Sequence, residues 1–526
     1  MPLGILRDDK LEHVPGTAPL SDQNKNDTEY AGVDASLLKH DSTGKIVLVP
    51  QPSDSINDPY NWPKMKKFLF VAAFLYGCGC VGAIGPLLGA GFVPLSAELD
   101  VPLPKFISGF QGALICAIGV GSLVCNTLAV KYGKRPIYLI TSLGLAVTCF
   151  WAAAAKSFPS LVAAGIADVW FVHERGFITG LFNLGVLGGI NLGPPIAGPV
   201  IQYAGYKTCL YAMGGAFVLQ LILTFLFMPE TAFVRSSTLN IDTTAHTIAV
   251  NEKTVEEHVE GSEAHHNASA RPLVDKKISF AREMLPYSGY VNHVSLWRVA
   301  VEPFKLLASP IVLWAVLLFT TILAWLVGIS IASSQIFSAP PYSFSIVEVG
   351  ATNVSSFVAG LLGSFISGPA IDGVSKFMAR KNKGIFEPEF RLPIMVVFVL
   401  LTAGGFFGWG EAAYQLSPWP VPVVVCLGLI NLGAQLGTTC LITYLVDCHR
   451  EQAGEALGVI NFFKNFFVFG LTFYFNTWIA DDGVRNVFFT LAGITIGVTL
   501  LTIPMYIFGK KSRSWVYRHN ITLTSG

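Results

Sequence analysis

The sequence is poor in charged residues. Asp, Glu, Lys and Arg together make up 13% of its 526 residues, whereas a soluble domain usually carries about 25%. The formal net charge is only +1, so no basic surface for nucleic acid is expected. Hydrophobic residues account for 52%, and they stand in long blocks separated by short basic patches. This combination predicts an integral membrane protein that crosses the bilayer many times.

The sequence also lacks the residue patterns that several kinds of function require. No glycine-rich loop has the spacing of a nucleotide-binding P-loop, which argues against an ATP-driven pump. No nucleophile stands beside a base in a recognisable pattern, so we do not expect an enzyme. Most of the 9 cysteines lie inside apolar blocks, and Cys78 and Cys80 have no histidine nearby. Neither a metal nor another cofactor is therefore expected.

Eleven apolar blocks have the length of about 20 residues that a spanning helix needs. They are 68–93, 107–130, 136–155, 177–204, 209–228, 310–337, 347–371, 393–409, 422–446, 457–480 and 487–508. Basic residues gather at alternate connections, which places both termini in the cytoplasm. We expect a disordered cytoplasmic tail at 1–67 and a first helical half at 68–228. A cytoplasmic central loop follows at 229–309, then a second helical half at 310–508 and a second cytoplasmic tail at 509–526.

A twelfth crossing is expected at "SFPSLVAAGIADVWFVHERG", residues 157–176. The block before it leads out of the cytoplasm, and the block after it begins at a cytoplasmic charge cluster, so the chain must return. Only about 16 residues are available, and as a helix they span about 24 Å against about 30 Å of hydrocarbon. Counted from matching points, the stretch 130–228 of the first half is 38 residues shorter than 372–508 of the second, and a longer loop in the second half explains 15 of them. About 23 residues, roughly one span, remain. We expect an all-α polytopic membrane protein of two six-helix halves, with eleven full spans and one short segment in place of helix 4.

Polar residues inside the spans are candidates for contact with a transported molecule, because they are expensive to place in lipid. Asn461, Lys464 and Asn465 stand at i, i+3 and i+4, on one face of a helix. Tyr444 and Gln335 add an aromatic and an amide side chain to this set of cavity candidates. Two alternatives remain open, since Lys464 can snorkel towards the membrane surface and buried amides often only join helices.

Charged residues at expected helix ends form a second set of candidates. Asp372 and Asp447 close helices at the cytoplasmic face, where each can anchor a base-rich loop or take part in transport. The other members lie in or next to the short segment of the first half: Asp168, Glu174 and Arg175.

Two motifs resemble those of a known family. "LAVKYGKRP" (128–136) is similar to the signature loop between helices 2 and 3 of the major facilitator superfamily, and Gly133, Lys134 and Arg135 fit it. "GLFNLGVLGGINLGPPIAG" (180–198) resembles the helix 5 signature of its antiporters. The residues at the signature spacing are Gly180, Gly189, Gly193, Pro194 and Gly198. Together with "FMPET" (227–231), these motifs resemble the fungal twelve-helix drug:proton antiporter branch.

This resemblance implies a major facilitator fold and a monomeric secondary transporter in the plasma membrane. Its expected partners are a small organic substrate, a proton and the lipid bilayer, and its expected action is proton-coupled efflux of a toxin, drug or secondary metabolite by alternating access. Uptake of organic cations or polyamines is one alternative, and a truncated, transport-inactive chain is another. The arginine that the family carries in helix 4 has no counterpart here, which leaves proton coupling open.

Overall fold

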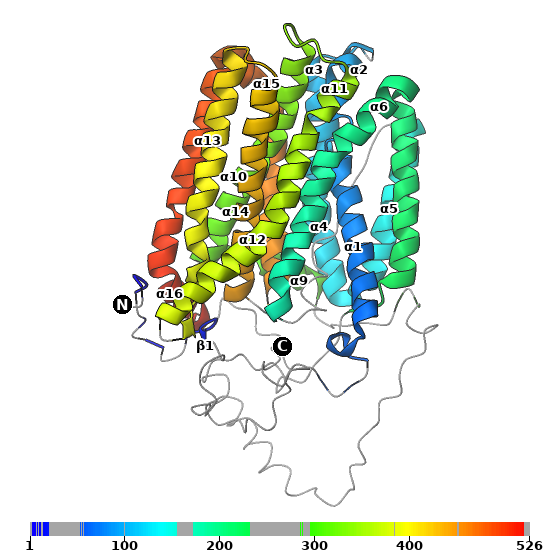
Figure 1. Ribbon diagram of the computed structural model, residues 1–526. Coiled ribbons are helices and arrows are strands. Elements are labelled where there is room, and N and C mark those ends of the chain that lie inside the picture. The colour runs from blue at the N-terminus through cyan, green and yellow to red at the C-terminus, as the bar shows by residue number, and fades with distance from the viewer. Residues whose placement is uncertain are drawn as a thin grey trace, which may run out of the picture.

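The computed structural model describes most of the helical part of the chain. Described are residues 3–6, 8, 10, 11, 14–19, 53, 55, 57–98, 100–154, 172–231, 285, 287, 295–382, 384–449 and 452–519, with the backbone alone for 151–154 and 172–184. Long helices run side by side through the molecule (Figure 1). We call the end that carries α9 (Leu296–Val301) and β1 (Ala18–Pro19) the tail end. The opposite end carries α2 (Phe92–Glu98) and α11 (Ile346–Ala351), and we call it the far end.

The first half of the bundle contains four long helices and two short ones among its described residues. Its helices are α1 (Lys64–Ile84), α2, α3 (Leu103–Ile107), α4 (Ala113–Tyr132), α5 (Lys134–Ala154) and α6 (Val172–Phe227). Short helical turns flank them: η2 (Pro59–Asn61), η3 (Gly89–Gly91) and η4 (Ser108–Gly112). Within α6 the chain folds back at Gly205, whose φ of 81° is a conformation that glycine adopts without a steric penalty. The helix therefore makes two antiparallel passes (Figure 1).

The second half repeats this plan. Its helices are α9, α10 (Pro310–Ser338), α11, α12 (Asn353–Lys381), α13 (Met395–Tyr414), α14 (Leu427–Cys448), α15 (Ala453–Leu500) and α16 (Thr502–Arg518). The connecting turns are η8 (Glu302–Ala308), η9 (Pro388–Ile394) and η10 (Val421–Cys426). Here α15 folds back at Gly483, with a φ of 79°, as α6 does at Gly205. The two halves thus end on helix pairs with the same kind of turn.

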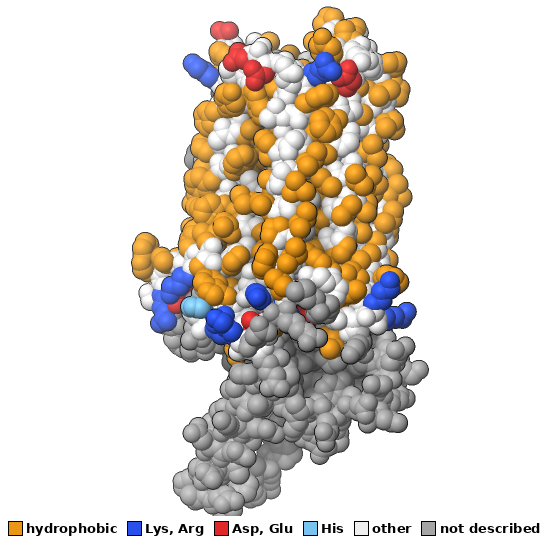
Figure 2. All heavy atoms as spheres, turned by 90° about the vertical axis from the view of Figure 1, so that its left-hand side faces the viewer, with side chains coloured by type: hydrophobic (Ala, Val, Ile, Leu, Met, Phe, Trp, Pro, Cys, Tyr) orange, Lys and Arg blue, Asp and Glu red, His pale blue; other side chains and the backbone are white. Residues whose placement is uncertain are grey.

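The described residues contain 8 helices that are long and apolar enough to cross a membrane. Two of them fold back on themselves, and α5 adds a further 21-residue helix. These passes correspond to the eleven predicted blocks. Figure 2 shows the resulting surface, a broad hydrophobic belt with Lys, Arg, Asp and Glu side chains gathered at its two ends. The expected all-α polytopic fold is therefore confirmed, while the shortened helix 4 and Asp168 lie outside the described residues.

The start of the chain contains an ordered segment that its polar composition did not predict. Leu6 N donates to Ile507 O at 3.0 Å, and Tyr506 Oη donates to Leu3 O at 2.7 Å. Further along, β1 pairs antiparallel with β2 (Ile385–Phe386). The side chain of Ile5 is fully buried in this contact. Residues of the expected disordered tail therefore pack on the tail end of the second half, because their few apolar side chains find a partner there.

Candidate functional site

The helix 5 signature brings α6 against α1. A Cβ at Gly189 would overlap the backbone of Gly79, and one at Gly193 would lie 2.9 Å from Ala83 O. Glycines spaced four apart on one face allow such close helix approach, which is how helices gain packing energy in a membrane. The signature is therefore a smooth contact surface within the first half. Of Gly180 the structure describes the backbone alone.

Beyond this contact, α6 also touches a helix of the second half. A Cβ at Gly350 of α11 would lie 2.5 Å from Pro194 O, and one at Gly198 would lie 3.0 Å from Ile346 O. Val347 N also donates to Gln202 Oε1 at 3.0 Å. The far-end part of the α6 signature thus packs directly on α11 of the second half.

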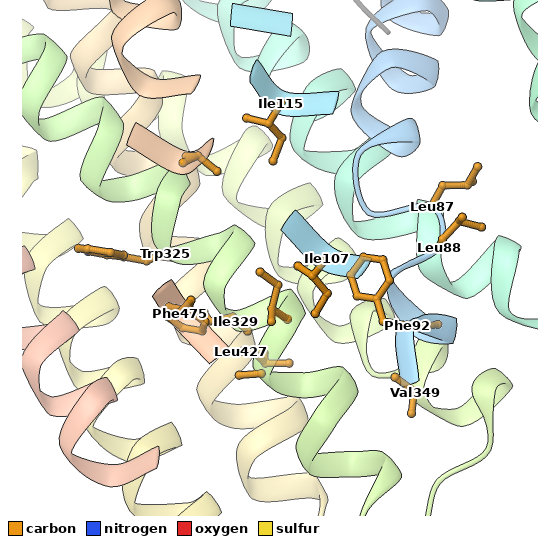
Figure 3. Packing of buried hydrophobic residues seen from close by; sticks show 14 of the residues in the cluster. Leu87, Leu88, Phe92, Ile107, Ile115, Trp325, Ile329, Val349, Leu427 and Phe475 are labelled. Atoms are coloured by element: carbon orange, nitrogen blue, oxygen red, sulfur yellow. The ribbon is translucent and has the colours of Figure 1, made fainter. Parts of the chain in front are cut away.

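An apolar cluster joins the two halves at the same end (Figure 3). Phe92 and Ile107 of the first half belong to one buried cluster with Ile329, Val349 and Leu427 of the second. Phe92 and Ile107 are each 0% exposed. Because these side chains come from both halves, separating the halves at the far end would expose this apolar surface.

A hydrogen-bonded pair also crosses between the halves inside the apolar belt. Asn191 Nδ2 on α6 donates to Asn431 Oδ1 on α14 at 3.1 Å. Asn431 Nδ2 in turn donates to Ser356 Oγ on α12 at 2.9 Å. All three residues are buried. We expected such buried amides to join helices by hydrogen bonds. Here the hydrogen bond joins a helix of one half to a helix of the other.

The predicted α15 face lies where three helices meet. Lys464 Nζ donates to Asn461 Oδ1 at 3.0 Å and lies 5.7 Å from the centre of the Phe319 ring on α10. Next to it, Asn465 faces α4, where a Cβ at Gly119 would lie 2.9 Å from Asn465 Cβ. The structure thus places these three candidates together, at the boundary between α15, α10 and the first half.

The other two cavity candidates lie elsewhere. Tyr444 is fully buried and packs edge-to-face on Trp314, with ring centres 5.6 Å apart. Gln335 Nε2 donates to Asn476 Oδ1, from α10 to α15. Neither contact brings Tyr444 or Gln335 to the Lys464 face.

The predicted helix-end acids meet on one arginine. Arg391 Nη1 lies 2.8 Å from Asp372 Oδ1, and Arg391 Nε lies 2.7 Å from Asp447 Oδ2. The guanidinium therefore joins α12 and the end of α14 to η9. The prediction that Asp372 closes its helix is wrong, because α12 continues to Lys381. The sequence predicted that these acids can anchor a base-rich loop but did not single out Arg391, because Asp447 lies 56 residues away from it along the chain. Of Glu174 and Arg175 only the backbone is described.

The loop signature of the first half is held by Glu230 of the "FMPET" motif. Its carboxylate accepts from the backbone N–H groups of Lys134 and Arg135, each at 3.1 Å. Gly133 has a φ of 90°, and a Cβ there would overlap Glu230. Arg135, at 1% exposure, donates to Phe225 O at 3.0 Å and to Met228 O. A carboxylate at the start of α5 is also favoured by the helix dipole.

A comparison with known families decides what this architecture is. The model of the Major Facilitator Superfamily matches residues 112–471. The chain belongs to this superfamily. Protein HOL1 of Saccharomyces cerevisiae is 24% identical over 98% of this chain and 99% of its own length. The efflux pump radE of Floropilus chiversii is 24% identical over 80% of this chain and 76% of that protein. The predicted family is confirmed, and the protein is a membrane transporter rather than an enzyme.

Solved structures agree on the fold. The proton:xylose symporter XylE of E. coli superposes with a TM-score of 0.52 at 13% identity, over 85% of this chain and 96% of XylE. The alignment with HOL1 extends over 591 positions, more than the 526 residues of this major facilitator chain.

The second half of this major facilitator protein carries its own buried charge cluster at the tail end. Arg513 of α16 bonds to Glu389 at 2.8 Å and to Glu387 at 2.9 Å, and Lys510 bonds to Glu387 at 2.5 Å. Burial raises the pKa of Glu387, but the charges of Arg513 and Lys510 outweigh it, so this pKa lies below its usual value. Thr17 of the N-terminal segment also donates to Glu387, at 2.8 Å. The cluster thus fixes three separate parts of the chain.

His449, next to this cluster, predicts an acid sensitivity. Burial and the nearby Arg513 guanidinium lower the pKa of His449 to about 4. Its Nε2 lies 3.1 Å from Ser309 Oγ. In the unfolded chain this histidine binds a proton near its ordinary pKa of about 6.5, so stability falls as the pH drops from there towards 4. We expect the transporter to lose about 2 kcal/mol between pH 7 and pH 5 through this residue.

Thermal unfolding of the purified protein in detergent measures this loss. His449→Gln keeps a hydrogen-bonding side chain but does not titrate, so its melting temperature should fall less between pH 7 and pH 5. Equal slopes for both proteins would show that His449 is not the sensitive group.

Proposed function

We propose that this transporter exports a small organic molecule in exchange for protons, by alternating access, from a cytoplasmic tail end across the plasma membrane. The packing of the α6 signature on α11 carries the proposal. Pro194 and Gly198 press on α11 at the far end, whereas Gly189 presses on α1 of its own half. A seal between the halves at one end is what alternating access needs, because the path must not be open on both sides at once. Exchange for protons is proposed because the α6 motif resembles the antiporter signature.

The transport path runs between the two halves in this proposal. The Asn191–Asn431 hydrogen bond and the apolar cluster around Phe92 and Ile329 lie on it. Both must separate when the far end opens, since the halves rock about a central site. The hydrogen bond contributes about 0.6 kcal/mol, as typical of membrane helices, so it does not lock the state. The Arg391 and Arg513 clusters hold the tail-end loops of the second half during this movement.

Proton coupling is the part of the proposal that depends on the short segment 157–176. The described ends support a crossing there, because α5 runs towards the far end and α6 begins at the tail end (Figure 1). A shortened helix 4 without the family's arginine would need another group to carry the proton. An inactive, truncated chain is the outcome if no group does.

Cellular retention of a fluorescent substrate tests direction and coupling together. Cells that express the transporter should retain less of the dye rhodamine 123 or fluorescein than cells without the gene. A protonophore should abolish the difference, because it removes the driving force. Higher dye retention in expressing cells would favour uptake. If export continues in the presence of the protonophore, transport is not coupled to protons. Equal retention of both dyes with and without the gene would favour the inactive chain.

A further inference from the structure

Lys464 differs from two other cations inside the second half. Arg391 and Arg513 each bond to two carboxylates. Lys464 is partly buried, and within the described residues no carboxylate oxygen lies within 4.0 Å of its ammonium group. Its printed contacts are the amide oxygen of Asn461 and the face of the Phe319 ring. At Arg391 and Arg513 the chain supplies the negative charge itself, whereas the described residues supply none at Lys464.

The position of this ammonium group argues against simple snorkelling. Lys464 leans one turn towards the tail end, as helical side chains do, and it stops at Asn461. Asn461 is still about 12 Å along the helix from Ala453, the first residue of α15. The charge therefore remains well inside the apolar belt instead of reaching its edge.

The same position borders the transport path. Asn465, the next residue, packs against Gly119 of the first half, and Phe319 belongs to α10 of the second. Asn465 Nδ2 is buried and has no hydrogen-bond acceptor within the described part of the chain. An ammonium group without a carboxylate partner and an amide donor without an acceptor, within the described residues, thus belong to adjacent residues at the boundary between the halves.

From this arrangement we infer that Lys464 binds an acidic group of the transported molecule, so that the substrates are organic acids, with Asn461 positioning the ammonium group and Phe319 lining one side. The inference rests on the proposed function, because it assumes that a small organic molecule passes between the halves. An uncompensated charge in an apolar interior costs several kcal/mol, and an anionic ligand removes this cost. A charge-assisted hydrogen bond from an ammonium group is also about twice as strong as a neutral one. A cationic molecule would meet repulsion at the same point.

Two dyes that share a xanthene ring system test the sign of the preferred charge. Fluorescein is an anion near neutral pH, whereas rhodamine 123 is a cation. Binding is measured by fluorescence anisotropy with the full-length protein in nanodiscs at pH 7.5. The wild-type protein should bind fluorescein at least tenfold more tightly than rhodamine 123. Lys464→Met should weaken fluorescein binding by tenfold or more and leave rhodamine 123 binding equal or stronger, while Lys464→Arg should retain most of the fluorescein affinity.

Controls separate a binding role from a folding role. Lys305→Met removes an exposed lysine outside the apolar belt, so it should change neither affinity. The Lys464→Met protein lacks a buried charge, so its melting temperature should be no lower than that of wild type. An unchanged melting temperature would show that weaker binding does not result from unfolding. The inference is overturned if wild type binds no fluorescein, if it prefers rhodamine 123, or if Lys464→Met binds fluorescein as wild type does.

The cellular retention assay and the binding assay can give different outcomes, and each outcome tests a different claim. Export of rhodamine 123 by cells, without any fluorescein binding, would leave the proposed export intact and overturn the acidic-substrate inference. Lys464-dependent fluorescein binding without export would overturn the proposed function and keep the binding site.

Discussion

Replacing Arg513 with methionine is expected to lower the free energy of unfolding by about 3–5 kcal/mol, the usual result of breaking a buried ion pair from one side. Arg513 is 2% exposed, and its partners Glu387 and Glu389 are at most 1% exposed. Without the guanidinium, two carboxylates remain buried with only Lys510 nearby. The melting temperature of the purified protein in detergent measures the loss, and the N-terminal segment should become sensitive to protease, because Arg513 also donates to Pro15 O.

A matched control lies two residues away. Lys511 is exposed on the same helix, so Lys511→Met should leave the melting temperature within about a degree of wild type. Adding Glu387→Gln and Glu389→Gln to Arg513→Met should recover part of the stability, since the buried charges are then removed on both sides. An Arg513→Met protein that melts with wild type would show that the buried pairing contributes nothing.

Replacing Gly189 with alanine should separate α1 from α6 and remove transport. The added Cβ would overlap the carbonyl group of Gly79, which is backbone and cannot rotate away. Overpacking of this kind costs about 1–3 kcal/mol, and a backbone clash belongs at the upper end. The yield of monodisperse protein on size-exclusion chromatography and the retention assay measure the effect.

Gly215 is the control on the second pass of the same helix. A Cβ there would meet nothing within 4 Å, so Gly215→Ala should be neutral or stabilise by up to about 1 kcal/mol through helix propensity. If Gly189→Ala expresses, melts and transports as Gly215→Ala does, the close contact between α1 and α6 is not required.

The two halves use opposite charges to fix equivalent loops. In the first half, Glu230 follows the last pass and caps the loop at Lys134 and Arg135. In the second half, Arg513 follows the last pass and holds Glu389 of η9, the turn that precedes α13. The tail-end loop between the second and third pass is thus tied to the last pass in both halves.

The sequence by itself determined the membrane class, the order of the spans and the family. These properties follow from local patterns, because a span needs about 20 apolar residues and the α6 signature depends on glycine spacing along one helix. The same patterns also placed Asn461, Lys464 and Asn465 on one face, since residues three and four apart are neighbours on any helix. The role of that face was still undecided.

Only the tertiary structure decided which groups meet across the chain. Arg391 binds Asp372 and Asp447, and Asn191 binds Asn431, over separations that no local pattern encodes. The packing of the first residues on the second half likewise could not be predicted from the sequence. A short polar segment becomes ordered only through contacts with a surface formed by distant residues. The missing carboxylate beside Lys464 is a property of the same kind. A charge is paired or unpaired according to its neighbours in space, and the packing of the helices chooses those neighbours.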